Sequence, residues 1–411
     1  MKKLIPSPYL NVLENRNFLV LVMVIFIGQF ASACLLLSLI VSVFSHTGSN
    51  FGVAGVVLSF TIPALLLMIF AGIVADLVDR RKIILAANIF IALVVLAIIY
   101  LGRTTVAFIP LSFLYFAGNS FFIPASSAAT AQVVKKNQLL IANSFFMLVL
   151  SGGLIFGFLT GAIINFFFGN RNLLILTELL LGFAVLLSFF LPRLDPVTRT
   201  KHTVWESIEN IKRGFLYSFS RKLLWLFFLT FAALQGVMMF GATIGPGFYD
   251  EIVGIPVERS PIFIFPFIGI GVLAGFYVVH RLVMNEFKIV KLGLAVMGLS
   301  LVSLGFLIKA EIFPYWAIIA SNILFLVFAG LGAILIFIAS RTGMQKLVPH
   351  SHQGTVFGAN IVLASIIATF MAPMAAIFEV VFGYLGILVL GGTALLLVFG
   401  FFTYIEKYAN Q

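Results

Sequence analysis

Long, uncharged apolar runs recur along the whole sequence, and they limit its fold more than any other feature. A helix that rises about 1.5 Å per residue needs about 20 apolar residues to cross about 30 Å of hydrocarbon. Runs of this kind lie at about 17–44, 51–75, 83–102, 105–132, 140–168, 172–191, 223–249, 261–281, 289–308, 312–340, 354–381 and 384–405. They do not alternate as the strands of a membrane β-barrel do. The sequence therefore predicts an all-α integral membrane protein with twelve transmembrane helices.

The composition excludes a soluble protein and gives no sign of catalysis. Of the 411 residues, 62% are hydrophobic and 9% are charged, whereas soluble domains carry about 25% charged residues. The single cysteine, Cys34, excludes a disulfide framework and a cysteine-based zinc site within this chain. The sequence has no glycine-rich loop followed by Lys and Ser or Thr, and no Ser, His and Asp arrangement stands out. We therefore expect no cofactor, no metal and no enzymatic activity.

The net charge of +11 is interpreted as a topology signal and not as a nucleic-acid surface. Of the 25 lysine and arginine residues, all but Arg103, Arg171, Arg259 and Lys309 fall in segments that share one side of the membrane if both termini are cytoplasmic. Positive residues gather on the cytoplasmic side. We expect a plasma (inner) membrane protein with both termini in the cytoplasm. A lipoprotein signal ending at Cys34 is disfavoured, because the apolar run continues to Phe44.

The chain looks internally duplicated. Pro63 precedes Gly72 by the same interval as Pro266 precedes Gly275. The only long polar stretch separates six runs from six. We therefore expect halves at 1–191 and 223–411, joined by a cytoplasmic linker at 192–222. Two such halves around a central path are typical of secondary transporters.

The linker itself carries an apolar helical face and a basic one. Trp205, Ile208 and Phe219 lie near one face of a helix, and Lys212 and Arg213 lie on the other side. This pattern predicts a helix in the membrane interface.

The loop after the second run resembles the signature of the major facilitator superfamily. That signature has Gly, a variable stretch, then Asp, Arg and a cluster of basic residues. Here it reads Gly72, Ile73, Val74, Ala75, Asp76, Leu77, Val78, Asp79, Arg80, Arg81, Lys82. Leu77 departs from the usual Arg. The resemblance covers nearly the whole chain and implies the twelve-helix fold of that family and a monomer.

Other positions are similar to the macrolide and siderophore exporter branch of the same family. They are Gly28, Gln29, Phe30, Thr47, Gly48, Ser49, Pro63, Gln345, Lys346, Leu347, Val348, Pro349 and Gly354. The arginine that many proton-driven members carry in the fourth helix is replaced by Leu114. The resemblance implies a drug:proton antiporter that works in multidrug efflux, with a small-molecule substrate, membrane lipid and a proton gradient as its partners.

The family resemblance also implies a gate on the inner side. Asp76 would face the positive end of the eleventh helix near Gly354 when the gate is closed, an interaction typically worth about 0.3 to 2 kcal/mol. Gly72, Asp79, Arg80 and Arg81 belong to the same loop. The alternative is that Asp76 is a solvated loop acid beside Arg80 and Arg81.

Glycines recur at every fourth position in the fifth and eighth runs. Such spacing lets two helices approach closely. In this family these helices pack across the interface between the halves, so we expect a sliding seam there. The glycines are Gly153, Gly157, Gly161, Gly271 and Gly275.

Four amides and several aromatic residues are candidates for the substrate path. If the family architecture holds, the path runs between the first, fourth, seventh and tenth helices, and we expect one amide near mid-depth in each. These residues and their apolar neighbours are Phe26, Gln29, Tyr115, Asn119, Gln235, Met239, Asn322 and Phe325. A wall of this kind suits an amphipathic, weakly polar ligand. The amides could instead hold helices together, at typically about 0.6 kcal/mol per bond.

The proton carrier is the least constrained part of the prediction. Glu178 is the deepest carboxyl group and is our candidate, although it could simply bond a neighbour or reach Arg171. The expected function is export of hydrophobic or amphipathic small molecules by alternating access. Movement of lysophospholipid or lipid between leaflets, or a transport-inactive scaffold or sensor, stays open as an alternative.

Overall fold

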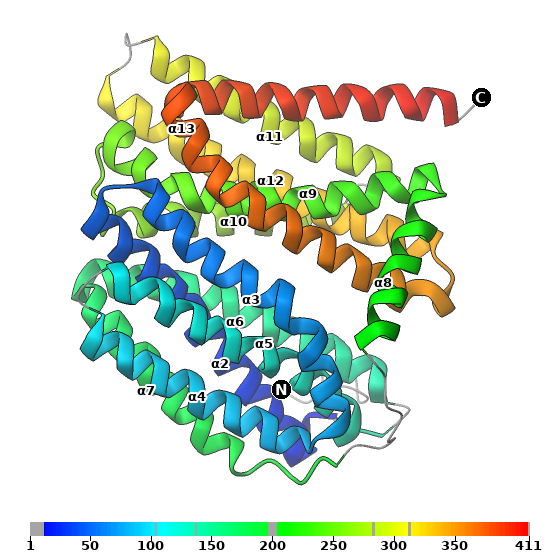
Figure 1. Cartoon of the computed structure of the whole chain (residues 1–411). Helices are drawn as coiled ribbons and strands as arrows, with labels where there is room; N and C mark the ends of the chain where they lie inside the picture. Colours follow the sequence, from blue (N-terminus) through cyan, green and yellow to red (C-terminus); the bar gives the residue numbers. More distant parts are fainter. Residues whose placement is uncertain are drawn as a thin grey trace. The chain divides into compact units, whose positions relative to one another are not determined.

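The computed structural model describes residues 12–102, 105–135, 138–195, 204–281, 284–310 and 314–409. Nearly all of this part of the chain is helical (Figure 1). It includes one π-helical segment, η2. The elements are α2 (Arg16–Thr47), α3 (Asn50–Leu77), α4 (Arg80–Leu101), α5 (Thr105–Val133), α6 (Leu139–Phe168), α7 (Asn170–Ser188), α8 (Val204–Phe219), α9 (Lys222–Gly247), η2 (Phe248–Val253), α10 (Ser260–Arg281), α11 (Glu286–Lys309), α12 (Tyr315–Leu347) and α13 (His350–Ala409). Residues 196–203 of the predicted linker, and 312 and 313 at the start of the tenth predicted run, lie outside this description.

The predicted all-helical membrane architecture is confirmed. Eleven helices in the described ranges are long and apolar enough to cross a membrane. The last of them, α13, is 60 residues long and breaks at Gly383, whose φ of 65° lies in the left-handed region. Figure 1 shows the change of direction between its orange and red arms. The two arms make the eleventh and twelfth spans.

The chain folds as two compact units, whose boundary does not follow the predicted halves. Unit 1 comprises Met1–Gly48 and Leu58–Ser207, and unit 2 comprises Ser49–Val57 and Ile208–Gln411. The division therefore passes through α3, whose first two turns belong to unit 2 and whose remainder belongs to unit 1. The sequence places all of α3 in the first half, because nothing in an apolar run marks which neighbours it contacts.

The helices of unit 1 pack around α2. This helix contacts α5, α6 and α7, and α4 contacts α5 and α7. Their shared core is built from side chains of α2 to α6 and of the segment after α7, among them Leu21, Ile84, Phe122, Phe146 and Leu191.

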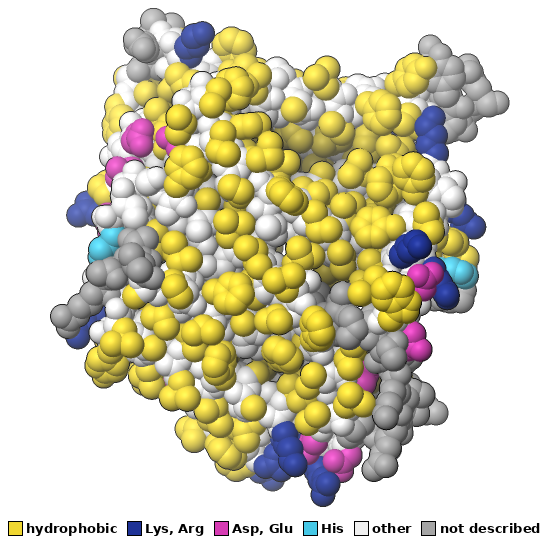
Figure 2. All heavy atoms as spheres, in the orientation of Figure 1, with side chains coloured by type: hydrophobic (Ala, Val, Ile, Leu, Met, Phe, Trp, Pro, Cys, Tyr) yellow, Lys and Arg dark blue, Asp and Glu magenta, His cyan; other side chains and the backbone are white. Residues whose placement is uncertain are grey.

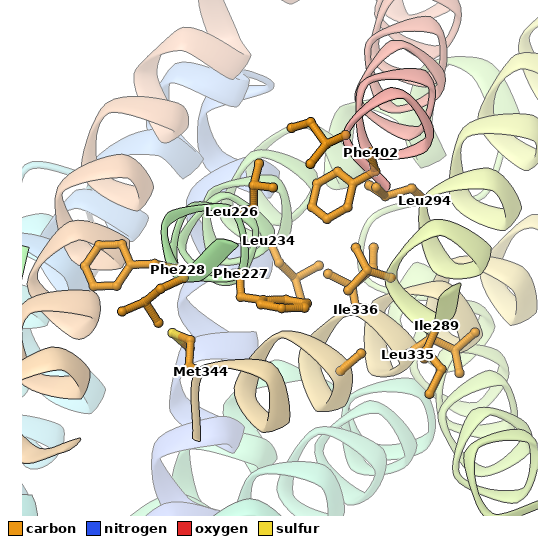
Figure 3. Packing of buried hydrophobic residues seen from close by; sticks show 14 of the residues in the cluster. Leu226, Phe227, Phe228, Leu234, Ile289, Leu294, Leu335, Ile336, Met344 and Phe402 are labelled. Carbon is orange, nitrogen blue, oxygen red and sulfur yellow. The ribbon is translucent and has the colours of Figure 1, made fainter. Parts of the chain in front are cut away.

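The helices of unit 2 repeat part of this pattern. α9 packs against α12 and α13, and α11 packs against α12 and α13. The core on one side of α9 contains Phe227, Leu294, Ile336 and Phe402 (Figure 3). The first helix of each half thus packs on the fifth, and the third packs on the sixth.

The interfacial position predicted for α8 stays a prediction, but its packing is clear. Gly214 lies so close to the Thr355 carbonyl of α13 that a side chain would not fit. The Tyr217 ring stacks on His352 with centroids 4.9 Å apart. Trp205 and Phe219 remain exposed. One face of α8 is therefore held by α13, and another presents large apolar side chains.

Both units present apolar surfaces of the kind that lipid covers. Large side chains in mid-helix positions are exposed, among them Leu93, Leu179, Leu273 and Leu397. Figure 2 shows hydrophobic side chains over most of the visible surface, with few charged groups among them. A surface of this composition is stable in hydrocarbon and not in water.

Candidate functional site

In unit 1, a buried hydroxyl pair joins the first and fourth helices near the middle of the spans. The hydroxyls of Ser32 on α2 and Tyr115 on α5 lie 2.8 Å apart, and Tyr115 is fully buried. Gln29 lies one turn from Ser32 and is 3% exposed. Among the described residues, its Nε2 has no hydrogen-bond partner. Asn119, one turn from Tyr115 on α5, is also buried. Three predicted site residues therefore lie on two contacting helices at similar depth.

Aromatic rings border this region. Phe26 on α2 lies 6.1 Å from the Phe30 ring and 6.4 Å from the Phe156 ring of α6, between ring centroids. The ring of Tyr115 packs edge-on against Phe116 at 5.1 Å. The ring contacts on α2, α5 and α6 at this depth are uncharged, and the assignment of Gln29 to a substrate path stays a prediction.

In unit 2, the predicted residues fall into two groups. Asn322 on α12 accepts a hydrogen bond from the Tyr249 hydroxyl in η2, and Phe325 packs into the cluster that contains Tyr249. Gln235 and Met239 lie on α9, and Gln235 is half-buried. Gln235 precedes Tyr249 by 14 residues, which is about 20 Å along a helix.

The expectation that Asn322 shares the depth of Gln235 is therefore wrong. α12 begins at Tyr315, so Asn322 lies only two turns inside the helix and is level with the far end of α9. The apolar run concealed this position because it extends without a break into the segment before the helix. Sequence reasoning also missed Ser32 and Tyr249, since a hydroxyl in an apolar run carries no pattern of its own.

The loop predicted to form a gate is tightly organised. Asp79 is the N-cap of α4, and its Oδ1 accepts from the Arg81 and Leu194 N–H groups, each at 3.0 Å. The Arg81 guanidinium donates to the Phe189 carbonyl at 2.8 Å. Asp79 therefore joins the start of α4 to the segment that follows α7.

The two members of the Asp76–Arg80 ion pair in this loop differ in exposure. Asp76 lies 3.8 Å from Arg80, and its side chain is 50% exposed. The Arg80 side chain is buried, and its Nε and Nη1 have no hydrogen-bond partner within the described ranges. There is open space around the position that a Cβ on Gly72 or Gly354 would take. The predicted pairing of Asp76 with the start of α13 stays a prediction.

The repeated glycines lie at helix contacts inside each unit. A Cβ on Gly153 would lie 2.7 Å from the Phe26 carbonyl oxygen, and one on Gly157 would lie 2.5 Å from that of Phe30. The same construction at Gly161 approaches Leu37 at 3.3 Å, so all three glycines face α2.

The glycines of α10 repeat this arrangement in unit 2. A side chain on Gly271 would collide with the Val327 carbonyl of α12, and one on Gly275 would approach the Leu331 carbonyl at 3.2 Å. The prediction that Gly153, Gly157, Gly161, Gly271 and Gly275 form a seam between the halves needs correction. Small residues at this spacing show that a backbone approaches, but not which one.

The predicted proton carrier lies on α7. Glu178 is partly buried, and its Oε2 has no hydrogen-bond partner in the described part of the chain. Its neighbours Ile175 and Leu179 on the same helix are exposed. A carboxylate oxygen without a partner beside lipid-facing residues is compatible with proton binding, but nothing here ties it to Gln29 or Tyr115.

Comparisons with known proteins match a family and a fold. The family model of the Major Facilitator Superfamily matches residues 18–373. Among solved structures, the chain is similar to the nucleoside transporter NupG at 13% identity, with a TM-score of 0.73 over 96% of this chain and 100% of that chain. It is similar to a POT family transporter in complex with 5-aminolevulinic acid at 11% identity, with a TM-score of 0.75 over 96% and 97%. At these identities the likeness establishes the fold alone. No curated protein matches.

Proposed function

Since the chain belongs to the Major Facilitator Superfamily and is a multi-pass membrane transporter, we propose that it exports neutral, amphipathic small molecules from the cytoplasm by alternating access. The proposal includes proton antiport, insertion in the plasma membrane and cytoplasmic termini. The exporter branch of the family, with drug-like or siderophore-like substrates, is the one that its sequence resembles.

One observation carries the substrate class. The helices that would line the path have no charged residue in their central parts: α5 has none at all, α9 has only Lys222 at its start, and α12 has only Arg341 and Lys346 in its last two turns. Gln29 instead offers a buried N–H group that has no hydrogen-bond partner among the described residues. A carbonyl, ether or ester oxygen on a largely apolar ligand would satisfy that group, whereas a charged ligand would find no counter-ion there.

A transport assay in inverted vesicles tests this proposal. The panel contains lipophilic dyes, macrolides and lysophospholipids, each with and without a proton gradient. Accumulation of dyes or macrolides that requires the gradient supports proton-coupled export. Movement of lysophospholipid alone supports the lipid alternative, and no movement of any compound supports a scaffold or sensor.

The gate is part of the same proposal. We expect Asp76→Asn to reduce dye transport strongly while leaving dye binding intact, because the negative charge would hold the gate closed in one state of the cycle. Asp195→Asn is the matched control, since Asp195 pairs with Arg193 in an exposed ion pair. Equal transport by both variants would remove the gate role of Asp76.

Proton coupling through Glu178 has its own test. Glu178→Gln should transport dye without dependence on the pH gradient if this carboxyl group carries the proton. A variant that keeps the gradient dependence of the unchanged protein removes Glu178 from the proposal and leaves export itself untouched.

A further inference from the structure

A buried amide at the start of α3 is bonded to two other helices of unit 2. Asn50 is 2% exposed. Its Nδ2 donates to the Tyr384 hydroxyl at 2.8 Å and to Glu379 Oε2 at 3.2 Å. Its Oδ1 accepts from the Gly247 N–H at 3.3 Å. The amide nitrogen therefore has a partner for each of its two hydrogens, and the amide oxygen accepts one further bond.

Tyr384 extends the network to a second carboxylate. Its hydroxyl accepts from Asn50 and donates to Glu251 Oε1 at 3.4 Å. Its ring packs on Phe248 of η2, with centroids 6.1 Å apart. Within the described residues, neither Glu251 nor Glu379 has a basic ion-pair partner. The carboxylates are thus bonded by neutral donors. A small shift of α3 would break the three bonds that Asn50 makes.

The backbone is shaped to admit this contact. A side chain on Gly247 would collide with the Tyr384 hydroxyl and lie 2.6 Å from Asn50 Nδ2. α9 changes into the π-helical turn η2 directly after Gly247, and Gly383 breaks α13 directly before Tyr384. Such departures from the α-helix cost stability and often occur at functional positions. Here two of them border one network.

The location of Asn50 gives the network a consequence. Residues Ser49–Val57 pack in unit 2, whereas α3 from Leu58 onward packs in unit 1 and ends at the loop of Gly72 and Asp76. The loop before Asn50 and those around Glu251 and Gly383 lie on the outer side in the topology predicted from the basic residues. One helix therefore carries this network at one end and the predicted inner gate at the other.

We propose that Asn50, Gly247, Glu251, Glu379 and Tyr384 form an outer clasp, in which Asn50 is a positioning residue that holds the first two turns of α3 in unit 2. The clasp opens and re-forms in each transport cycle. The closed clasp is inferred from the hydrogen bonds alone and does not depend on the substrate. Its opening in a cycle rests on the proposed transport function.

Labelling of a buried cysteine tests whether the clasp holds α3. Cys34 is the only native cysteine and is buried, so the background is Cys34→Ala. Val53 is a fully buried residue of the same two turns and is replaced as Val53→Cys. A membrane-impermeant maleimide is added to the protein in lipid nanodiscs, where both faces are accessible. We expect slow labelling, which rises about tenfold on Asn50→Ala or Tyr384→Phe, as loss of a buried hydrogen bond predicts.

Phe51→Ala is the matched control, because Phe51 follows Asn50 on α3 but is exposed. It should leave the labelling rate unchanged. Tyr384→Phe keeps the ring and its packing, so it remains informative if Asn50→Ala does not fold. Gly247→Ala is a third variant, which pushes the clasp open from the opposite side. An unchanged labelling rate in Asn50→Ala and Tyr384→Phe overturns the clasp.

The role in the cycle is read from transport kinetics. Tyr384→Phe should change the maximal rate of dye export and leave the dye concentration at half-maximal rate nearly unchanged, as expected for a residue that does not touch the substrate. If labelling rises but both kinetic constants stay the same, the clasp exists but does not open in the cycle, and that part of the proposal is wrong. If the unchanged protein exports nothing while labelling still rises, the proposed function fails and the closed contact stands.

Discussion

Gln29 illustrates how a single side chain can oppose stability and serve binding. Its buried Nε2 has no partner within the described residues, and an unpaired buried donor costs about 1 to 3 kcal/mol. A leucine of similar size would remove that cost. Retaining the amide is physically reasonable if a substrate oxygen meets the N–H group when it binds.

Gln29→Leu should therefore have two effects of opposite sign. We expect dye affinity to fall about fivefold, as loss of one ordinary hydrogen bond predicts, and the melting temperature to rise. Fluorescence titration and thermal unfolding in detergent measure the two quantities. Asn88→Leu is the control, because Asn88 is a buried amide that bonds Ser188 between α4 and α7. An unchanged affinity in both Gln29→Leu and Gln235→Leu would exclude these amides from the path.

Asp79 differs from Gln29, because its buried carboxylate already accepts two hydrogen bonds. Asp79→Ala removes the cap of α4 and leaves the Leu194 N–H group buried and unpaired. We expect a loss of about 1 to 3 kcal/mol of stability, measured as a lower melting temperature. Asp79→Asn keeps the accepting oxygen and should therefore retain most of the stability. Asp76→Asn alters only a 3.8 Å contact between a half-exposed carboxylate and the buried Arg80, so it should lower stability by less than Asp79→Ala does. Equal melting temperatures for Asp79→Ala and Asp76→Asn would show that the cap contributes little.

At the scale of helices, the glycines of α6 and α10 decide how closely neighbours approach. Hydrocarbon around the helices gives no hydrophobic drive for association, so close packing carries much of the stability. The approach of α6 to α2 is limited by backbone atoms, which cannot move aside as a flexible side chain can.

Gly157→Ala should separate α2 from α6 and lower the melting temperature by several degrees. Gly182→Ala in α7 is the matched control, because a Cβ there has open space and alanine favours a helix by about 1 kcal/mol over glycine. The control should be neutral or stabilising. Equal effects of the two substitutions would mean that the α2–α6 contact is looser than the structure has it.

The helices themselves were predictable, and most of their contacts were not. Apolar runs of sufficient length predict every span, because in lipid a backbone has few other options. Because these runs are uniformly apolar, they do not show how deep in the membrane a residue such as Asn322 lies. They also do not show which helix a glycine such as Gly157 contacts. The sequence did not predict a role for Asn50, because it directly precedes an apolar run and asparagine is common in loops at such positions. Its three hydrogen-bond partners lie far away in the sequence, and no local sequence pattern predicts them.

At the scale of the whole chain, the distribution of basic residues predicts on which side of the membrane each loop lies. Lys82 at the start of α4 and Arg171 at the start of α7 should lie on opposite sides of the membrane. Both positions are exposed. Single Lys82→Cys and Arg171→Cys variants in the Cys34→Ala background are labelled in sealed, right-side-out vesicles with an impermeant maleimide. Only Arg171→Cys should react. Reaction of both, or of Lys82→Cys alone, would contradict the orientation.

The long separation between Asn50 and its partners has a consequence during biosynthesis. Gly247 follows Asn50 by 197 residues, Glu379 by 329 and Tyr384 by 334. The ribosome therefore releases the start of α3 long before the residues that bury it, and the translocon must insert this helix with its polar end still unmatched. A nascent chain halted before Glu379 should leave that end open to protease, and completion of the last two spans should close it.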